Sequence, residues 1–125
     1  MAIQYYLSEW ERNMTGQPLS AEGLLRGLGA TGKLIGFRYA IHIIASVAED
    51  PTRMHLITKR LYPEVAQEFG TTPSAVERAV RNLIYSIWNR GDRSCLERVA
   101  GARLMRPPTN GEFIDMLAGY LRNHR

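Results

Sequence analysis

Four polar side chains between Glu77 and Asn82 have the types and spacing to form hydrogen bonds with the edges of DNA bases. An arginine can donate two parallel hydrogen bonds to O6 and N7 of guanine, and a glutamate can accept one from the N4 amine of cytosine. At about 100° per residue, Arg78 and Arg81 fall on one side of a helix, with Glu77 and Asn82 at its flanks. A charged helix face is more often simply solvated, so the pattern alone leaves both interpretations open.

The helix that would carry these side chains is predicted to run from Pro73 to Arg90. Thr71 and Thr72 offer hydroxyl caps, and Pro73 suits the first turn of a helix, where its missing N–H is no loss. The side opposite Arg78 is apolar and must be packed against the rest of the chain. It consists of Val76, Ala79, Val80, Leu83 and Ile87.

A shorter helical pattern, Pro63 to Phe69, comes just before it. Val65, Ala66 and Phe69 recur at helical spacing, and Gly70 is the residue best able to end the helix in a left-handed conformation. A helix, a turn that contains glycine and a longer helix together form the outline of a helix-turn-helix.

The amino-acid sequence of this region resembles that of a known family. The chain reads LITKRLYPEVA over residues 56–66 and TTPSAVERAVRN over residues 71–82. Two further blocks are GFRY over residues 36–39, similar to GYQY, and PTNGEFI over residues 108–114, similar to PTNSEFI. In order and spacing, residues 28–121 resemble the DNA-binding effector domain of the sporulation master response regulator of endospore-forming bacteria.

The resemblance implies an all-α, compact multi-helix domain that binds double-stranded DNA at specific sequences and regulates transcription. It assigns Glu77, Arg78 and Arg81 to base edges. Asn82 stands where the family has histidine, and Ala75 where it has arginine, so the preferred DNA box is expected to differ at its margins. Candidates for phosphate contacts, chosen on charge and position only, are Lys59, Arg60, Ser74 and Arg90.

Two partner expectations also come from the resemblance. Family members pair their effector domains on adjacent boxes, which implies a homodimer on tandem sites. They also contact the sigma subunit of RNA polymerase through the segment that follows the recognition helix. Here that segment is about three residues shorter and, at Leu96 to Val99, more charged, which weakens the second expectation.

Composition and charge agree with a partner that is a polyanion. The chain has 125 residues and a formal charge of +4, and residues 51–106 carry ten Lys and Arg against five Asp and Glu. Phosphate backbones are the obvious partner for such a surface. With no run of about 18 apolar residues and a single cysteine, Cys95, the sequence favours a cytoplasmic protein that is associated with the nucleoid.

The domain organisation is predicted as an N-terminal helical extension, residues 1–27, and an effector domain, residues 28–125. The extension would hold a helix over residues 1–14 and a short helix from Ala21 to Leu28, capped by Ser20. Nothing in it resembles the receiver domain of the family, so we expect a freestanding effector or a fragment. The first helix could cover the core of the domain or pair two chains.

The other helices are expected over residues 33–49, 54–61, 95–100 and 112–121, with Asn110 as the cap of the last one. Asp50-Pro51 should end the first of these, because a residue before proline avoids the helical region. No strand is expected anywhere.

Two rival functions remain open. One is a small nucleotide-binding enzyme, which would rest on the stretch GLGATGKL, residues 27–34, because this stretch nearly matches a phosphate-binding loop. Such motifs count only after a strand, so the stretch is interpreted as a helix end and turn. A protein-interaction module with the same fold is the other alternative. His42, His55 and His124 are far apart, so no metal or other cofactor is expected, and no catalytic constellation suggests an enzyme.

Overall fold

The computed structural model describes residues 19–124, and every regular element in that part of the chain is helical. The predicted helix over residues 1–14 lies outside the described residues. In chain order the elements are α2 (Ala21–Gly27), α3 (Ile35–Glu49), the 3₁₀ helix η1 (Pro51–Leu56), the π-helix η2 (Ile57–Leu61), α4 (Tyr62–Phe69), α5 (Pro73–Arg90), α6 (Arg93–Ala100) and α7 (Asn110–Asn123).

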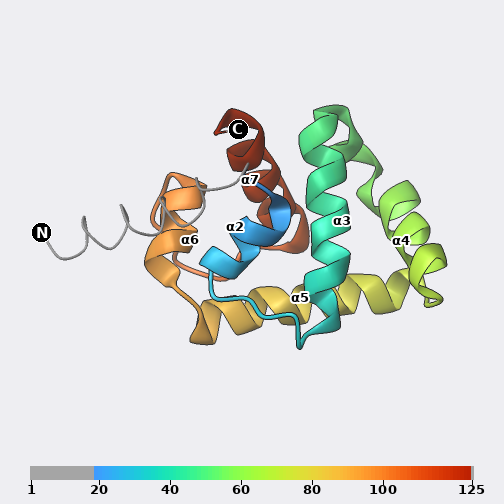
Figure 1. Cartoon of the computed structure of the whole chain (residues 1–125), viewed down its shortest axis with the longest axis horizontal. Helices are drawn as coiled ribbons and strands as arrows, with labels where there is room; N and C mark the ends of the chain where they lie inside the picture. The colour runs from blue at the N-terminus through green and yellow to red at the C-terminus, as the bar shows by residue number, and fades with distance from the viewer. Residues whose placement is uncertain (1–18, 125) are drawn as a thin grey trace, which may run out of the picture.

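Helix α3 stands at the centre of the molecule and packs against both α5 and α7 (Figure 1). Helix α5 runs across the lower edge, with α4 at one of its ends and α6 beyond the other. This arrangement leaves one long side of α5 uncovered, which is the requirement for a helix that contacts DNA.

Every described helix except η1 contributes buried residues to the core, and α5 contributes one continuous stripe to it. Five of its side chains are almost completely buried, and burying each stabilises the fold by roughly 1.5–3 kcal/mol. Four of them were predicted from helical spacing, whereas Ile84 was not and Ala79 is only partly buried. The five are Val76, Val80, Leu83, Ile84 and Ile87.

Helices α3 and α5 cross at Gly36, a residue of the block that reads GFRY. A Cβ atom at Gly36 would lie 2.2 Å from the carbonyl oxygen of Ala79 and 2.7 Å from its carbon. Only glycine allows the two backbones to come so close, and this contact fixes where α5 lies against the central helix.

The helix-turn-helix is confirmed at both of its inner boundaries. Helix α4 ends at Gly70, whose φ of 67° is left-handed, and Thr72 caps α5 by accepting a hydrogen bond from the Ala75 N–H (3.1 Å). Ser20 caps α2 in the same way, accepting from the Gly23 N–H (3.0 Å).

Several other boundaries differ from the prediction, and α7 extends from Asn110 to Asn123 instead of over residues 112–121. The segment predicted as one helix over residues 54–61 starts earlier, at Pro51, because Asp50 accepts hydrogen bonds from both the N–H and the hydroxyl of Thr52. It is a 3₁₀ helix up to Leu56 and a π-helix from Ile57. Helix α6 begins two residues earlier than predicted because Asp92 accepts from the Cys95 N–H. Helix α3 begins at Ile35, two residues late, because a turn occupies residues 31–34.

The cap of α7 was predicted wrongly. Thr109, not Asn110, is the N-cap, and it forms a capping box in which its hydroxyl accepts from the Glu112 N–H and its N–H donates to the Glu112 carboxylate (2.9 Å). The side chain of Asn110 is thereby released for a contact with other helices.

The glycine-rich stretch forms the end of α2 and a turn, as predicted. Its Gly29 has a φ of 93°, and a Cβ atom there would lie 2.9 Å from Cα of Gly91, just after α5. The Asp92 N–H also donates to the Leu28 carbonyl (3.0 Å). The glycine therefore allows two segments to meet, and no strand precedes it in the described part of the chain.

The proposed division into residues 1–27 and 28–125 stays a prediction. Leu24 and Leu25 of α2 are fully buried in the same core as α3 and α7. None of the described helices combines the length and apolarity needed to cross a membrane.

Candidate nucleic-acid interface

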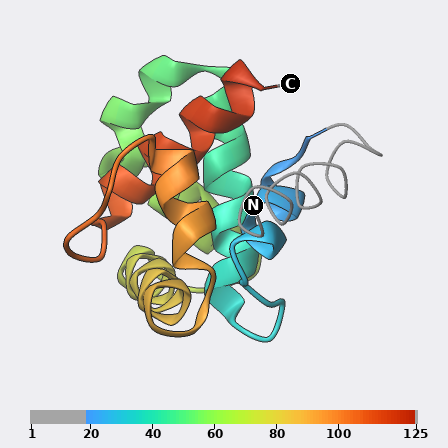
Figure 2. The same ribbon diagram turned by 90° about the vertical axis from the view of Figure 1, so that its left-hand side faces the viewer.

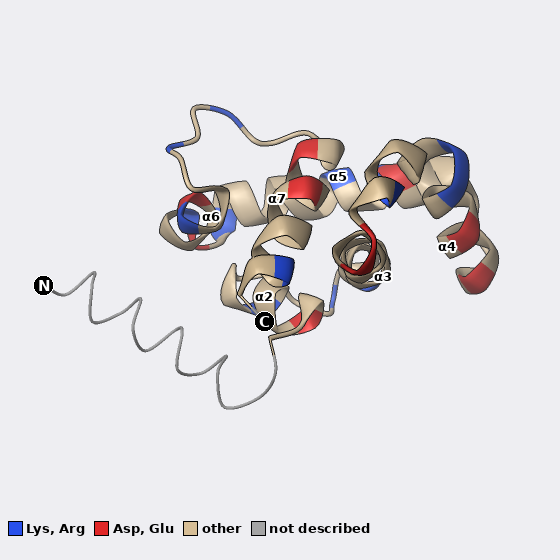
Figure 3. Cartoon of the chain, turned by 90° about the horizontal axis from the view of Figure 1, so that it is seen from above, with Lys and Arg blue, Asp and Glu red and all other residues tan. Residues whose placement is uncertain are grey.

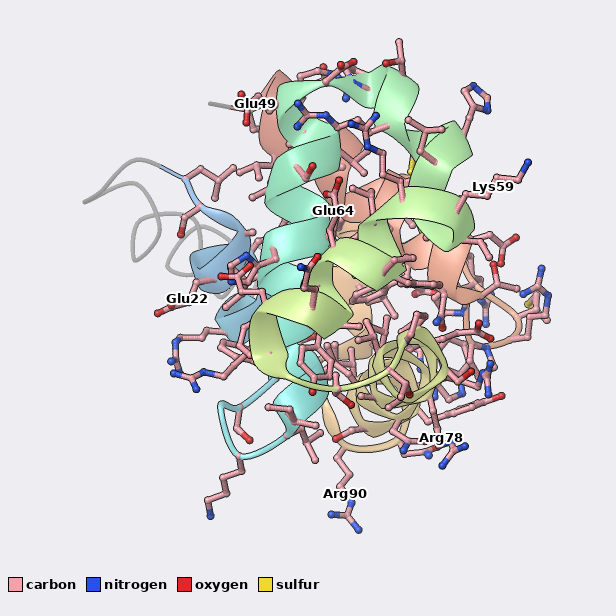
Figure 4. All side chains as sticks on the ribbon, turned by 90° about the vertical axis from the view of Figure 1, so that its right-hand side faces the viewer. Glu22, Glu49, Lys59, Glu64, Arg78 and Arg90 are labelled. Atoms are coloured by element: carbon pink, nitrogen blue, oxygen red, sulfur yellow. The ribbon has the colours of Figure 1, made fainter. Side chains whose placement is uncertain are left out.

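The uncovered side of α5 presents the side chains predicted to contact bases. Ser74, Arg78 and Asn82 are all exposed, and Arg78 has no hydrogen-bond or ion-pair partner within residues 19–124. In Figure 4, which looks nearly along α5, Arg78 projects away from the body of the molecule. An extended guanidinium without a partner is free to donate to an acceptor outside the chain.

Glu77 and Arg81 are not free in the same sense, because they bind each other. Nη2 of Arg81 lies 2.6 Å from Oε1 of Glu77, one helical turn away, and about half of each side chain remains exposed. An exposed ion pair of this kind contributes only about 0.3–0.5 kcal/mol. The pair therefore holds the two side chains in place beside the groove. Breaking it costs little free energy when either side chain binds a stronger partner.

The predicted phosphate contacts do not lie on one side of α5. Lys59 and Arg60 come from the π-helix η2, where both are exposed and Arg60 pairs with Glu64 (3.2 Å). Arg90 is the last residue of α5, and in Figure 4 it projects downward from the body, whereas Lys59 projects sideways. Cationic side chains thus flank the reading side of α5 on two sides.

Charge is distributed unevenly over the molecule. Seen from above, the basic segments of η2 and of the loop between α6 and α7 lie along one side, together with the acidic segments of α7, and the acidic segments of α4 lie away from it (Figure 3). The groove beside Arg81 of α5 opens between η2 and that loop, so cationic side chains border α5 there and favour a negatively charged partner.

An open groove of about 720 Å³ borders α5 on the Arg81 side. Its walls come from α5, from η1 and η2, and from the loop that leads into α7. Arg106 in that loop binds Glu112 through two parallel contacts of 3.0 and 3.1 Å. Its hydrogen bonds hold the pKa of Glu112 down at about 2, so the carboxylate stays ionised and neutralises Arg106.

Sequence reasoning missed the role of Asn110. Its amide nitrogen donates to the hydroxyl of Tyr62 (3.1 Å) and to the main-chain carbonyl of Glu77 (2.9 Å). One side chain thus ties the start of α7 to both helices of the helix-turn-helix. The signal available was that Tyr62 and Asn110 both lie in blocks that resemble the family, yet only the fold reveals that the blocks meet.

Cys95 is part of the buried core. Its side chain is completely buried, and burial, together with a hydrogen bond to Asp92, raises the pKa of the thiol to about 12. A thiol that stays protonated is a poor nucleophile and a poor metal ligand. Among residues 19–124, no three His, Cys, Asp or Glu side chains gather in a way that could hold a metal ion.

A family model with the description "Sporulation initiation factor Spo0A C terminal" matches residues 21–121. The chain belongs to the Spo0A C-terminal family. This family is a DNA-binding transcription factor domain of sporulation and a regulatory, not an enzymatic, family. The match begins with α2 and covers every described helix except the last two residues of α7.

Membership in the Spo0A C-terminal family confirms the resemblance found in the sequence and the all-α fold expected from it. It agrees with the basic, uncovered side of α5. The roles of individual side chains on that surface remain predictions.

Proposed function

We propose that this protein reads specific DNA sequences by placing α5 in the major groove and thereby regulates transcription. Arg78 and Arg81 are assigned to guanine, Glu77 to cytosine, and Asn82 to a base at the edge of the box. Lys59, Arg60, Ser74 and Arg90 are assigned to phosphates, which position the domain on the duplex without reading sequence.

The observation that carries this proposal is the exposed, unpaired guanidinium of Arg78 on a helix whose opposite side is buried. Val76 and Val80, which flank it in sequence by two residues on each side, are both fully buried, so the orientation of Arg78 is fixed by the core. Because the fold itself determines where this donor points, no rearrangement of α5 is needed before it meets a base.

The test begins with a selection of bound sequences from a random DNA library, followed by binding measurements with Arg78→Ala. We expect the variant to lose about 1–3 kcal/mol of specific binding and to lose its preference at one G·C pair. The matched control is Arg122→Ala, which removes one exposed arginine near the end of α7, at the opposite end of the molecule from α5.

Equal affinity of Arg78→Ala and wild type for the selected site would mean that α5 does not read that base pair. If the wild-type protein selects no sequence and its affinity for DNA does not depend on salt, the alternative of a protein-interaction module is favoured.

Two finer partner proposals accompany this function. The first is that two copies occupy adjacent boxes, since one helix-turn-helix reads only a few base pairs. The second is that α6, which directly follows α5, contacts the sigma subunit of RNA polymerase, although Glu97 and Arg98 make this segment more charged than the family pattern. A DNA-binding role would place the protein in the cytoplasm with the nucleoid.

A further inference from the structure

The turn between α2 and α3 is an exposed surface that the contacts assigned above leave unused. Residues 31–35 are all exposed, and the side chains of Leu34 and Ile35 are two of the few large apolar groups that face solvent. The ammonium group of Lys33 has no hydrogen-bond or ion-pair partner among the described residues. The ammonium group of Lys33 therefore has no structural role among the described residues.

Close contacts fix this turn alongside α5 at both of its ends. Before the turn, Gly29 meets Gly91, and the Leu28 carbonyl accepts from the Asp92 N–H (3.0 Å) just beyond the end of α5. After the turn, Gly36 lies against the carbonyl of Ala79 near the middle of α5. Its position relative to the reading helix is therefore set by backbone contacts.

The turn lies on the opposite side of α5 from the groove and from the basic loop. Looking along α5 from its other end, Figure 2 shows the loop between α6 and α7 on one side of the helix and the turn before α3 on the other. On the helix surface, Ala79 and Arg90 both fall about 100–120° from Arg78 in one direction, and Arg81 falls about 60° in the other. Arg90 consequently projects from the same side as the turn.

The turn side of α5 also carries basic residues, and the nearby carboxylate of Glu22, which lines the same pocket as Lys33, is paired with Arg26 (3.3 Å). The chain has no Asp or Glu from Leu28 to Ala48, a stretch that includes Lys33 and Arg38. Arg90, which projects in the same direction as the turn in Figure 4, also has no partner within the described part of the chain. No carboxylate in this stretch opposes the approach of a phosphate.

We propose that residues 31–35, with Lys33 as the cation, contact the sugar–phosphate backbone of the DNA strand on the far side of α5 from Lys59 and Arg60. This inference rests on the proposed function of α5, because a helix in the major groove has one backbone strand on each side. Contacts on both strands hold the helix in the groove without reading sequence themselves.

The test compares Lys33→Gln with Arg122→Gln, which lowers the net charge by the same amount at the far end of α7. Binding to a selected duplex is measured by fluorescence anisotropy over a range of salt concentrations. We expect Lys33→Gln to reduce the slope of log K against log salt by about 0.9, the effect of one phosphate contact, whereas Arg122→Gln leaves the slope unchanged. The loss of affinity should be the same for selected and unrelated duplexes.

Ethylation interference on each strand gives the second readout. We expect Lys33→Gln to remove interference at one or two phosphates of a single strand, and Lys59→Gln to remove it on the other strand. Identical slopes and interference patterns for Lys33→Gln and wild type would overturn the inference. If Ile35→Ser then lowers cooperative binding to two boxes, the turn is a contact between copies of the chain and the inference is likewise overturned.

The two proposals can fail separately. If Arg78→Ala loses base preference while Lys33→Gln binds as wild type, α5 reads DNA and only the contact with the second strand is wrong. If Arg78→Ala has no effect, the failure lies in the proposed function itself.

Discussion

At the scale of single residues, the proposed interface depends on Asn110, a side chain to which no DNA contact is assigned. Asn110 holds the main-chain carbonyl of Glu77, in the first half of α5, and the hydroxyl of Tyr62, at the start of α4. Both bonds are partly buried, so neither is easily replaced by water. This amide therefore helps to set the position of α5 relative to α4, which the predicted base contacts require.

We expect Asn110→Ala to lower the free energy of unfolding by about 1–3 kcal/mol, because it leaves a partly buried carbonyl and hydroxyl without their donor. Urea denaturation followed by circular dichroism measures the change. Tyr62→Phe removes only one of the two bonds and should cost less. If the two variants are equally stable, the bond to the Glu77 carbonyl contributes nothing.

The carboxylate of Glu112 makes a second prediction at this scale, about pH. The folded protein holds the pKa of Glu112 at about 2, below the ordinary value of 4.5 for a glutamate, mainly through the hydrogen bonds from Arg106 and next through the N–H of Thr109. A lowered pKa in the folded state means that this carboxylate stabilises the fold above pH 4.5 and that its contribution is lost as the pH falls from 4.5 towards 2.

Comparison of wild type with Glu112→Gln isolates this effect from that of the other carboxylates. The glutamine keeps an oxygen that can accept from the Thr109 N–H but loses the charge that pairs with Arg106. We expect wild type to be the more stable of the two at pH 7 and the difference to shrink as the pH approaches 2. A difference that is constant over this range would show that the ion pair does not form in solution.

At the scale of elements, the placement of α5 depends on how closely it approaches α3. Gly36→Ala would put a methyl group 2.2 Å from the Ala79 carbonyl oxygen, so the two helices must move apart. Overpacking of this kind costs about 1–3 kcal/mol, and more where the backbone cannot yield. Since the neighbouring atom is backbone, we expect a cost at the upper end of that range.

Thermal unfolding of Gly36→Ala, with Gly32→Ala as the control, tests this contact. A Cβ atom at Gly32 has no neighbour within 4 Å, so the control tests the loss of a glycine in the adjacent turn without a clash. A shift of α5 should also weaken specific DNA binding in Gly36→Ala. Similar melting temperatures for the two variants would mean that α3 and α5 are not packed as described.

At the scale of the whole molecule, the question is how one small domain finds its site. A single helix-turn-helix contacts a few base pairs, and such modules bind at useful affinity when two of them occupy half-sites with a defined spacing. We therefore expect this protein to occupy two adjacent boxes cooperatively, at a lower concentration than a single box.

Quantitative footprinting on one-box and two-box duplexes measures this cooperativity. Insertion of about five base pairs between the boxes, half a turn of DNA, places the second copy on the opposite face and should abolish the effect. If the two boxes are occupied independently at every spacing, the protein binds as a monomer and its specificity comes from one domain alone.

The sequence by itself determined the helices and the side of α5 that faces outward. Thr72, Pro73 and Gly70 define the helix-turn-helix through local chemistry, namely a hydroxyl cap, a fixed φ and a left-handed end, none of which depends on distant residues. Apolar residues at helical spacing then determined which side of α5 is buried, and Arg78 had to lie on the other. Blocks of residues similar to the family predicted the fold and the class of partner, and the family match confirmed both.

Only the tertiary structure decided what lies beside α5. Asn110 was expected to cap a helix, but a capping box formed by Thr109 and Glu112 releases it to bind Tyr62 and the Glu77 carbonyl, 48 and 33 residues away. The turn that carries Lys33 likewise lies alongside α5 because Gly29 and Gly36 permit two close backbone approaches. Such contacts join residues that are remote in the chain, and helical periodicity, which describes only local neighbours, contains no information about them.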